Sequence, residues 1–281
     1  MKKFTLSLVI ALISGGMLLA QGNASNVEQR GDDNTTGVTQ VGSNNTARVI
    51  QKDSDNSADV SQNGAGNFID AQAEGGNNIV TIQQVGNGNA VLQLISEANN
   101  TASISQEGNS NIAVQTLASN GSEASVLQQG NSNQVFQDQS GVGNITARAS
   151  QNGDGNFIGQ DQDGENIGSF VTQIGNANQA NVAQSGTSIF MGALQEGNNN
   201  TIDVAQDGSD NFAGEEGDPR LSQTGDSNVI NLIQNGSNNS SAIIQEGNLN
   251  TGINTQNGAD HTSSILQLGN RNAATVTQSN N

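Results

Sequence analysis

The sequence lacks several residue types on which compact domains and active sites depend. It has no cysteine, tryptophan or tyrosine, only one histidine and one proline, and aromatic residues make up 2% of its 281 positions. Without cysteine, no disulfide framework can stabilise the chain. Without cysteine or a second histidine, nucleophilic triads and zinc sites are excluded. We therefore expect neither an enzyme nor a bound metal or cofactor.

Positive charge is also scarce. Eight Lys and Arg residues stand against 26 Asp and Glu residues, which gives a formal net charge of −18. This balance opposes the phosphate contacts that drive nucleic-acid binding, and it disfavours an anionic membrane surface. We expect no nucleic-acid partner and no membrane insertion.

The N-terminal residues have the pattern of a secretory signal peptide. Two lysines follow the first methionine, residues 4–13 are mostly apolar, and small residues lead to a cleavage site after Ala20 or after Ala24. We predict a signal peptide over residues 1–20 and a secreted chain over residues 21–281. Its net charge is about −20, because two lysines are removed.

The rest of the chain repeats a short phrase every eleven residues. Residues 40–51 read QVGSNNTARVIQ, with Gln first, Gly two residues later, Asn at five, small apolar residues at seven and nine, and Gln at eleven opening the next copy. From Gln29 to Gln278 the three columns have few exceptions. These are Ala73, Ile95 and Leu117 in the Gln column, Asp53, Glu97 and Ser119 in the Gly column, and Ser122, Ile167, Ile189 and His261 in the Asn column.

The spacing within each copy predicts a β-strand. Side chains of a strand alternate between its two faces, so positions five, seven, nine and eleven share one face. Positions seven and nine are small and apolar in most copies, whereas Gly, Asn, Asp and Ser at the other end favour a turn. The period of two and the many Gly and Asn residues exclude an α-helix.

One such strand cannot bury its inner face alone, so two successive copies are expected to enclose a thin core as a rung of 22 residues. Gln93, Gln115, Gln137 and Gln160 replace the apolar residue at position nine in every second copy, and we expect them to stack on one sheet. The sequence therefore predicts an all-β, two-sheet, amyloid-like β-solenoid of about eleven rungs, each strand-turn-strand-turn.

We predict that the inward Gln and Asn side chains form amide ladders along the stack and that the glycines form its turns. The ladder residues are Gln40, Asn45, Gln51, Gln62, Asn67, Gln106, Asn111, Gln173, Asn178, Gln184, Gln195, Asn200, Gln234, Asn239, Gln267, Asn272 and Gln278. The turn residues are Gly42, Gly64, Gly108, Gly175, Gly197, Gly236 and Gly269.

One interruption breaks the repeat. Gln206 and Gln223 are 17 residues apart instead of eleven, and the extra residues fall around 213–222. This segment contains Pro219, which cannot donate a ladder hydrogen bond, so we predict an inserted loop that bulges from the stack. A tolerated insertion and a functional loop both remain possible interpretations.

The repeat argues against three other functions. His261 occupies the Asn column, so it is interpreted as a ladder substitution and not as a base or ligand. Asp-rich turns such as residues 53–56 are similar to calcium loops, but the calcium-binding solenoid has a nine-residue period. The outward threonine column, which includes Thr35 and Thr46, is too interrupted to match an ice lattice.

The phrase Gln-x-Gly-x-x-Asn-x-Ala followed by Gln resembles the curlin repeat of bacterial curli fibres, over about residues 29–278. Good matches are Gln40, Gly42, Asn45, Ala47 and Gln51, then Gln173, Gly175, Asn178, Ala180 and Gln184, and Gln267, Gly269, Asn272, Ala274 and Gln278. The resemblance implies an extracellular amyloid subunit of a biofilm matrix. It also implies export in an unfolded state through an outer-membrane secretion channel and polymerisation with itself on a nucleator subunit. The major type is favoured, because the last copies contain only one basic residue, Arg271, whereas nucleating curlins have a basic terminal repeat.

The sequence thus indicates a fibre subunit that grows when a disordered monomer folds on an exposed strand edge. The alternative is a monomeric secreted solenoid that acts as an adhesin or a ligand-binding surface. We also expect assembly to be faster near pH ~4, where carboxylates are protonated. The phenylalanines of the mature chain fall at outward positions, Phe190 and Phe212 on adjacent rungs, and could bundle fibres laterally.

Overall fold

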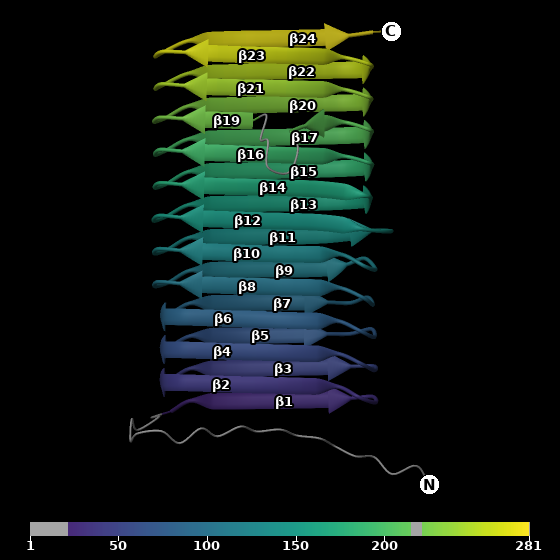
Figure 1. Ribbon diagram of the computed structural model, residues 1–281, viewed down its shortest axis with the longest axis vertical. Helices are drawn as coiled ribbons and strands as arrows, with labels where there is room; N and C mark the ends of the chain where they lie inside the picture. The colour runs from purple at the N-terminus through teal and green to yellow at the C-terminus, as the bar shows by residue number, and fades with distance from the viewer. Residues whose placement is uncertain (1–21, 215–220, 281) are drawn as a thin grey trace.

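The chain forms a straight column of stacked β-strands. The computed structural model describes residues 22–214 and 221–280, and within these ranges the chain consists of strands and turns without any helix. The first and last strands lie at opposite ends of the column (Figure 1). The predicted two-sheet solenoid of about eleven rungs is confirmed.

Alternate strands belong to two parallel sheets, here called sheet A and sheet B. Sheet A contains β1 (Ala24–Arg30), β3 (Thr46–Lys52), β5 (Phe68–Ala73), β7 (Ala90–Ile95), β9 (Ile112–Ala118), β11 (Gln134–Gly141), β13 (Phe157–Glu165), β15 (Gln179–Thr187), β17 (Thr201–Ser209), β20 (Val229–Ser237), β22 (Thr251–Ala259) and β24 (Ala273–Ser279). Sheet B contains β2 (Thr35–Ser43), β4 (Ser57–Ala65), β6 (Ile79–Asn87), β8 (Thr101–Glu107), β10 (Glu123–Gln129), β12 (Ile145–Asn152), β14 (Ile167–Ile174), β16 (Phe190–Glu196), β18 (Phe212–Ala213), β19 (Leu221–Thr224), β21 (Ser240–Glu246) and β23 (Thr262–Leu268).

Each strand is paired in register with the strand one rung away. Val49 of β3 faces Ala71 of β5, an offset of 22 residues that repeats along most of both sheets. The offset is 23 where the chain has one extra residue, as between Glu123 and Thr146, and 28 across the interruption, as between Ala193 and Leu221. Equivalent residues of successive rungs therefore lie directly above one another.

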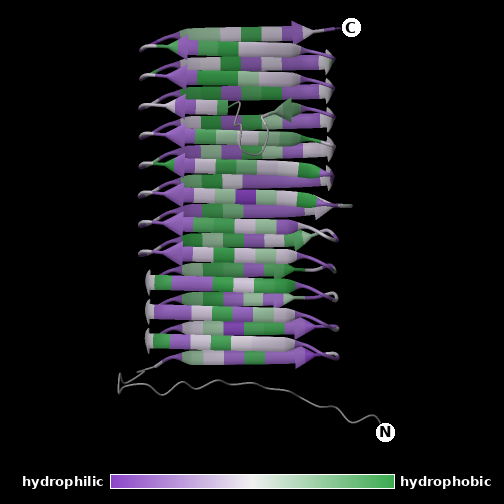
Figure 2. Ribbon diagram, in the orientation of Figure 1, coloured by the Kyte–Doolittle hydropathy of each residue, from purple (hydrophilic) through white to green (hydrophobic). Residues whose placement is uncertain are grey.

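A narrow core runs the whole length of the column between the sheets. It is filled by the apolar residues of positions seven and nine, such as Ile69, Ile158 and Ile202, which are fully buried. Buried Asn and Gln side chains flank this apolar seam on both sides. In Figure 2 the turns at both edges are mostly hydrophilic and the hydrophobic residues concentrate along the middle of the strands.

The predicted glutamine stack at position nine lies on sheet A, in β7, β9, β11 and β13. The Nε2 of Gln93 donates to Oε1 of Gln115 at 3.0 Å, and Gln115 and Gln137 continue the row to Gln160 with bonds of 2.8 Å each. The prediction that these four side chains share one sheet was correct.

One position of the asparagine column was assigned incorrectly. The spacing places Asn144 five residues after Gln139, but Ile145 is the buried residue, and it pairs with Ile167 of the next rung. The extra residue lies before Ile145 in the turn, which leaves Asn144 exposed. Three isoleucines, Ile145, Ile167 and Ile189, therefore succeed one another and form a separate apolar cluster.

The interruption splits one strand of sheet B. β18 ends at Ala213 and β19 begins at Leu221, and both pair with β16 on one side and β21 on the other. Residues 215–220 of the predicted loop lie outside the described residues, as do residues 1–20 of the predicted signal peptide. The division of the chain into these parts stays a prediction.

Candidate functional site

The candidate site is the set of side-chain ladders that runs along both edges of the column. Strands of sheet A and sheet B run in opposite directions (Figure 1), so all turns after sheet B strands form one edge and all turns after sheet A strands form the other. We call the first the regular edge and the second the variable edge.

A continuous glutamine ladder follows the ends of the sheet B strands. Gln40 Nε2 donates to Gln62 Oε1 at 2.8 Å, and Gln173 Nε2 donates to Gln195 Oε1 at 2.8 Å. The ladder comprises Gln40, Gln62, Gln84, Gln106, Gln128, Gln151, Gln173, Gln195, Gln223, Gln245 and Gln267. Each amide donates to the next rung toward the C-terminus, so the ladder has a direction.

The same amides also join the two sheets. Gln62 Nε2 donates a second hydrogen bond to the carbonyl of Thr46 on sheet A at 3.1 Å, and Gln173 does the same with Phe157 at 2.9 Å. A buried amide whose hydrogens are both bonded avoids the desolvation penalty of an unpaired polar group. Each glutamine therefore ties its own rung to the next and one sheet to the other.

The corresponding ladder on sheet A is broken. It runs from Gln139 through Gln162, Gln184, Gln206, Gln234 and Gln256 to Gln278. Before it, the column is occupied by Ala73, Ile95 and Leu117, and Gln51 is bonded only to the rungs before it. Because Leu117 offers no donor, the buried Oε1 of Gln139 has no hydrogen-bond partner.

Asparagine at position five links three levels of the regular edge. The backbone N–H of Asn178 donates to Oδ1 of Asn156 at 3.0 Å, and its Nδ2 donates to the carbonyl of Gly197 at 2.8 Å. Asn45, Asn67, Asn111 and Asn200 have the same arrangement. At the two ends, Asn23 accepts from Asn45, and Asn272 donates its N–H to Asn250. This ladder has no substitution along the regular edge.

The turn glycines have two reasons to be glycine. Those named from the sequence, Gly42, Gly64, Gly108, Gly175, Gly197, Gly236 and Gly269, all have positive φ. In addition, a Cβ on Gly175 would lie 2.0 Å from the carbonyl oxygen of Gly197, and one on Gly42 equally close to that of Gly64. The stacking of rungs leaves no room for a side chain, a constraint that the turn chemistry alone does not reveal.

Two features of the turns were missed from the sequence. Position four also has positive φ, as in Asn44 (56°) and Ser110 (58°), and it is Asn, Asp, Gly or Ser in every described turn except at Ala177, Leu249 and Arg271. Position three of the regular edge carries an exposed Asn or Asp ladder from residue 87 onward. Its members are Asn87, Asn109, Asn131, Asp154, Asn176, Asn198, Asp226, Asn248 and Asn270. Both signals are visible as columns once the repeat is aligned by edge.

All exceptions in the Gln, Gly and Asn columns lie along the variable edge. The three non-glycine turn residues, the apolar cluster of Ile145, Ile167 and Ile189, and the gap in the Gln column belong to turns or strand ends on this side. Local contacts replace the ladder there. The hydroxyls of Ser119 and Ser122 are 2.5 Å apart. His261 keeps only the backbone bond of the ladder, since its N–H donates to Asn239 Oδ1 at 3.2 Å, and its ring contacts the carbonyl of Asn257 at 3.0 Å.

The described residues lack two further features that would indicate another function. They contain no group of three or more metal-ligating His, Asp or Glu side chains, and no helix in them is long and apolar enough to cross a membrane. Among the described residues, Arg30 pairs with Glu28 of its own strand, and the other ion pairs connect neighbouring rungs on the surface, as between Arg48 and Asp70 at 3.0 Å. Such exposed pairs add little stability.

Comparison with known proteins supports the interpretation of the repeat. Residues 22–52, which span β1 to β3, match the curlin associated repeat family. The chain carries a curlin associated repeat. The matched curlin segment contains Gln40, Gly42, Asn45 and Gln51, so the resemblance seen in the sequence is confirmed for the first rung and a half. A comparison with curated proteins finds no match. The curlin repeat and the solenoid together point to a structural protein.

Proposed function

We propose that this protein is the structural subunit of an extracellular, amyloid-like fibre, in which copies stack end to end and continue each other's sheets and ladders. The observation that carries the proposal is the continuity of the ladders. Backbone pairing, the Gln amides and the Asn amides repeat at every rung of the regular edge. Stacks of this kind are the structural basis of amyloid stability.

The ends of the described stack have complementary chemistry. At one end, Gln40 presents an Oε1 that receives no hydrogen bond from a preceding rung, and at the other end Gln267 presents an Nε2 without a following rung. The inward side chains of the outermost strands, such as Val27 and Val276, are only partly buried. Strand pairing between β1 or β2 of one copy and β24 or β23 of another would bury these groups.

Secretion and partners follow from the resemblance to curlins. A secreted chain, export through an outer-membrane channel, a nucleator subunit and a role in biofilm and adhesion belong to this proposal. The acidic surface supports the view that the partner is another copy and not nucleic acid.

A seeded polymerisation assay tests the proposal. We expect residues 21–281, purified in denaturant and diluted into buffer, to form thioflavin-positive fibres after a lag, because nucleation requires several strands to pair at once. Preformed fibre fragments should shorten the lag. A chain that remains folded and monomeric at tens of micromolar would contradict the proposal and favour the alternative of a monomeric solenoid adhesin.

A further inference from the structure

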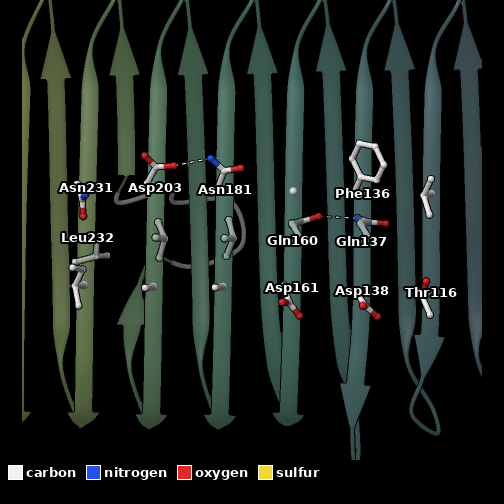
Figure 3. Close-up of a pocket in the computed structure, with 17 residues that line it drawn as sticks. Thr116, Phe136, Gln137, Asp138, Gln160, Asp161, Asn181, Asp203, Asn231 and Leu232 are labelled. Carbon is white, nitrogen blue, oxygen red and sulfur yellow. Dashed lines mark hydrogen bonds between the residues drawn. The ribbon is translucent and has the colours of Figure 1, made fainter.

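The outer face of sheet A contains a groove that the stacking of rungs does not use. It extends over strands β9 to β20 with a volume of about 610 Å³. Its floor consists of small residues at Gly159, Ala183 and Ala205, and Thr116 of β9 and Asn231 of β20 lie at its two ends (Figure 3). The outward side chains on either side of the small residues are larger, so the depression is built by the sequence of this region.

Three carboxylates, those of Asp138, Asp161 and Asp203, line this groove. Asp138 and Asp161 occupy equivalent positions in the neighbouring strands β11 and β13 and lie side by side in Figure 3. Partial burial, together with the nearby Asp161 carboxylate, raises the pKa of Asp138 above its ordinary value of 3.8. The groove thus presents unbalanced negative charge next to an apolar floor.

The outer face of sheet B carries a ridge with the opposite properties. The ring centroids of Phe170 and Phe190 are 5.1 Å apart, and the guanidinium carbon of Arg148 lies 5.1 Å from the centre of the Phe170 ring. Phe212 is paired with Phe190 in the following strand. Arg148 is 40% exposed and also approaches Glu123 at 3.3 Å. The ridge is apolar, with the Arg148–Glu123 ion pair at one end.

Groove and ridge lie back to back at the same level of the column. Gln160, next to Asp161 in β13, donates to the carbonyl of Arg148 across the core at 3.3 Å. Gln184, next to Ala183 in β15, donates to the carbonyl of Gly168 at 3.1 Å, two residues before Phe170. A second copy displaced sideways, without sliding along the axis, would therefore place Arg148 close to Asp138 and Asp161, and Phe170 over Ala183.

We propose that the sheet B ridge of one copy docks into the sheet A groove of a second copy, so that columns associate side by side in register. The contact is heterologous, because each copy has one ridge and one groove, and it therefore continues without closing. It buries partly exposed rings against small residues and brings the Arg148 guanidinium, which also approaches Glu123, to two carboxylates. Single folded copies carry both surfaces, so the contact does not require end-to-end stacking.

Cross-linking between single-cysteine variants tests the contact, since the natural chain has no cysteine. Thr172 lies two residues after Phe170 on the ridge side, and Asn181 lies two residues before Ala183 in the groove. We expect a mixture of T172C and N181C to give mixed cross-links with a short bis-maleimide, whether the copies are monomers or fibres. S103C, three rungs away on the same face of sheet B, mixed with N181C serves as the control. Equal yields in the two mixtures would overturn the proposal.

Charge reversal identifies the groups responsible. Adding R148E to both cysteine chains should reduce the mixed cross-link to the level of the control, and adding D161K as well should restore it. D32K changes an acidic residue outside the groove and should leave the yield unchanged. Persistence of the cross-link in R148E, with circular dichroism showing a folded stack, would exclude this contact. Loss of seeding with an unchanged cross-link would instead contradict the proposed fibre function.

Discussion

Both edges of the column reverse the chain between the two sheets, but positions two and five of the turns vary less along the regular edge than along the variable edge. Along the regular edge every turn has Gly at position two and Asn at position five, whereas the variable edge replaces Gly by Asp53, Glu97 and Ser119. Asp53 keeps a positive φ of 67°, while Glu97 and Ser119 adopt negative φ. The turn can thus be rebuilt locally, provided that the strands on either side stay in register.

The difference shows which requirements are general and which are local. A turn needs only a chain reversal of the correct length, but a close-packed glycine column also needs the absence of Cβ at every level. At the regular edge each glycine lies against the carbonyl of the next, so one exception would disturb two neighbours. At the variable edge the columns are already interrupted, and changes there affect fewer contacts.

The largest expected effect comes from two glycines of a single regular-edge turn. A Cβ on Gly153 would lie 2.0 Å from the Gly175 carbonyl oxygen, whereas a Cβ on Gly155 would meet nothing within 4 Å. We expect G153A to lower the free energy of unfolding by at least about 3 kcal/mol and G155A by only about 1 kcal/mol, the cost of a left-handed backbone. Guanidinium denaturation measures both, and equal losses would contradict the stacking constraint.

The asparagine ladder should give the next largest effect. N178A removes the acceptor of the Asn200 N–H and the donor to the Gly197 carbonyl, so two buried groups lose their partners. We expect a loss of about 2 kcal/mol in unfolding free energy and slower fibre elongation. Q179A changes an exposed neighbour and should stay within about 0.5 kcal/mol. Similar losses in both variants would mean that the ladder contributes nothing.

Restoring the glutamine column at the variable edge tests whether the ladder is cooperative. L117Q supplies a donor for Gln139 Oε1 but leaves its own oxygen without a donor beneath Ile95, so we expect a loss of about 1 kcal/mol. The triple variant A73Q/I95Q/L117Q joins Gln51 to Gln139 through continuous amides. The unfolding free energy of the triple variant should be higher, by about 1 kcal/mol or more, than the value obtained by adding the changes measured for the three single variants. Additive effects would show that the amides act independently.

The smallest expected effect on stability concerns Asp138, which lies on the outer face of sheet A and not in a turn. The pKa of Asp138 is raised by partial burial and by Asp161, so the folded state holds this proton more firmly than the unfolded chain. Stability should therefore rise as the pH falls through the raised pKa, and it should be lower above it. D138N should flatten this part of the pH profile and D154N, in the exposed turn ladder, should not. The denaturation midpoint between pH 7 and pH 4 is the measurement.

The sequence was sufficient for the fold because equivalent residues are stacked at every rung. Period, strand direction and the inward columns follow from alternation alone, and the Gln93 row predicts which copies share a sheet. The error at Asn144 arose because a one-residue insertion can be placed on either side of a turn without changing the next Gln. The burial of Ile145 against Ile167 and Ile189 shows that the inserted residue precedes Ile145.

Less of the candidate site than of the fold could be predicted from the sequence. The ladder residues could be named in advance, but the second positive φ at position four and the close approach of successive glycines depend on where neighbouring rungs lie in space. The groove and the ridge were not predictable in combination. Residue types at the outward strand positions do not recur at a fixed spacing. Whether Arg148 on sheet B lies at the same level as Asp161 on sheet A depends on how the two sheets are aligned in space.

The split strand of sheet B shows how each strand acquires its alignment. Met191 and Ala193 are separated by Gly192 alone, yet their partners Ala213 and Leu221 are separated by seven residues of chain, and both partners still sit in their proper columns. Position is thus copied from the strand beneath and not counted along the chain from the last turn. A column with this property keeps its register, because a length error in one copy is not passed to the following rungs. Foreign peptides could be inserted between Ala213 and Leu221 and displayed at one fixed site per subunit.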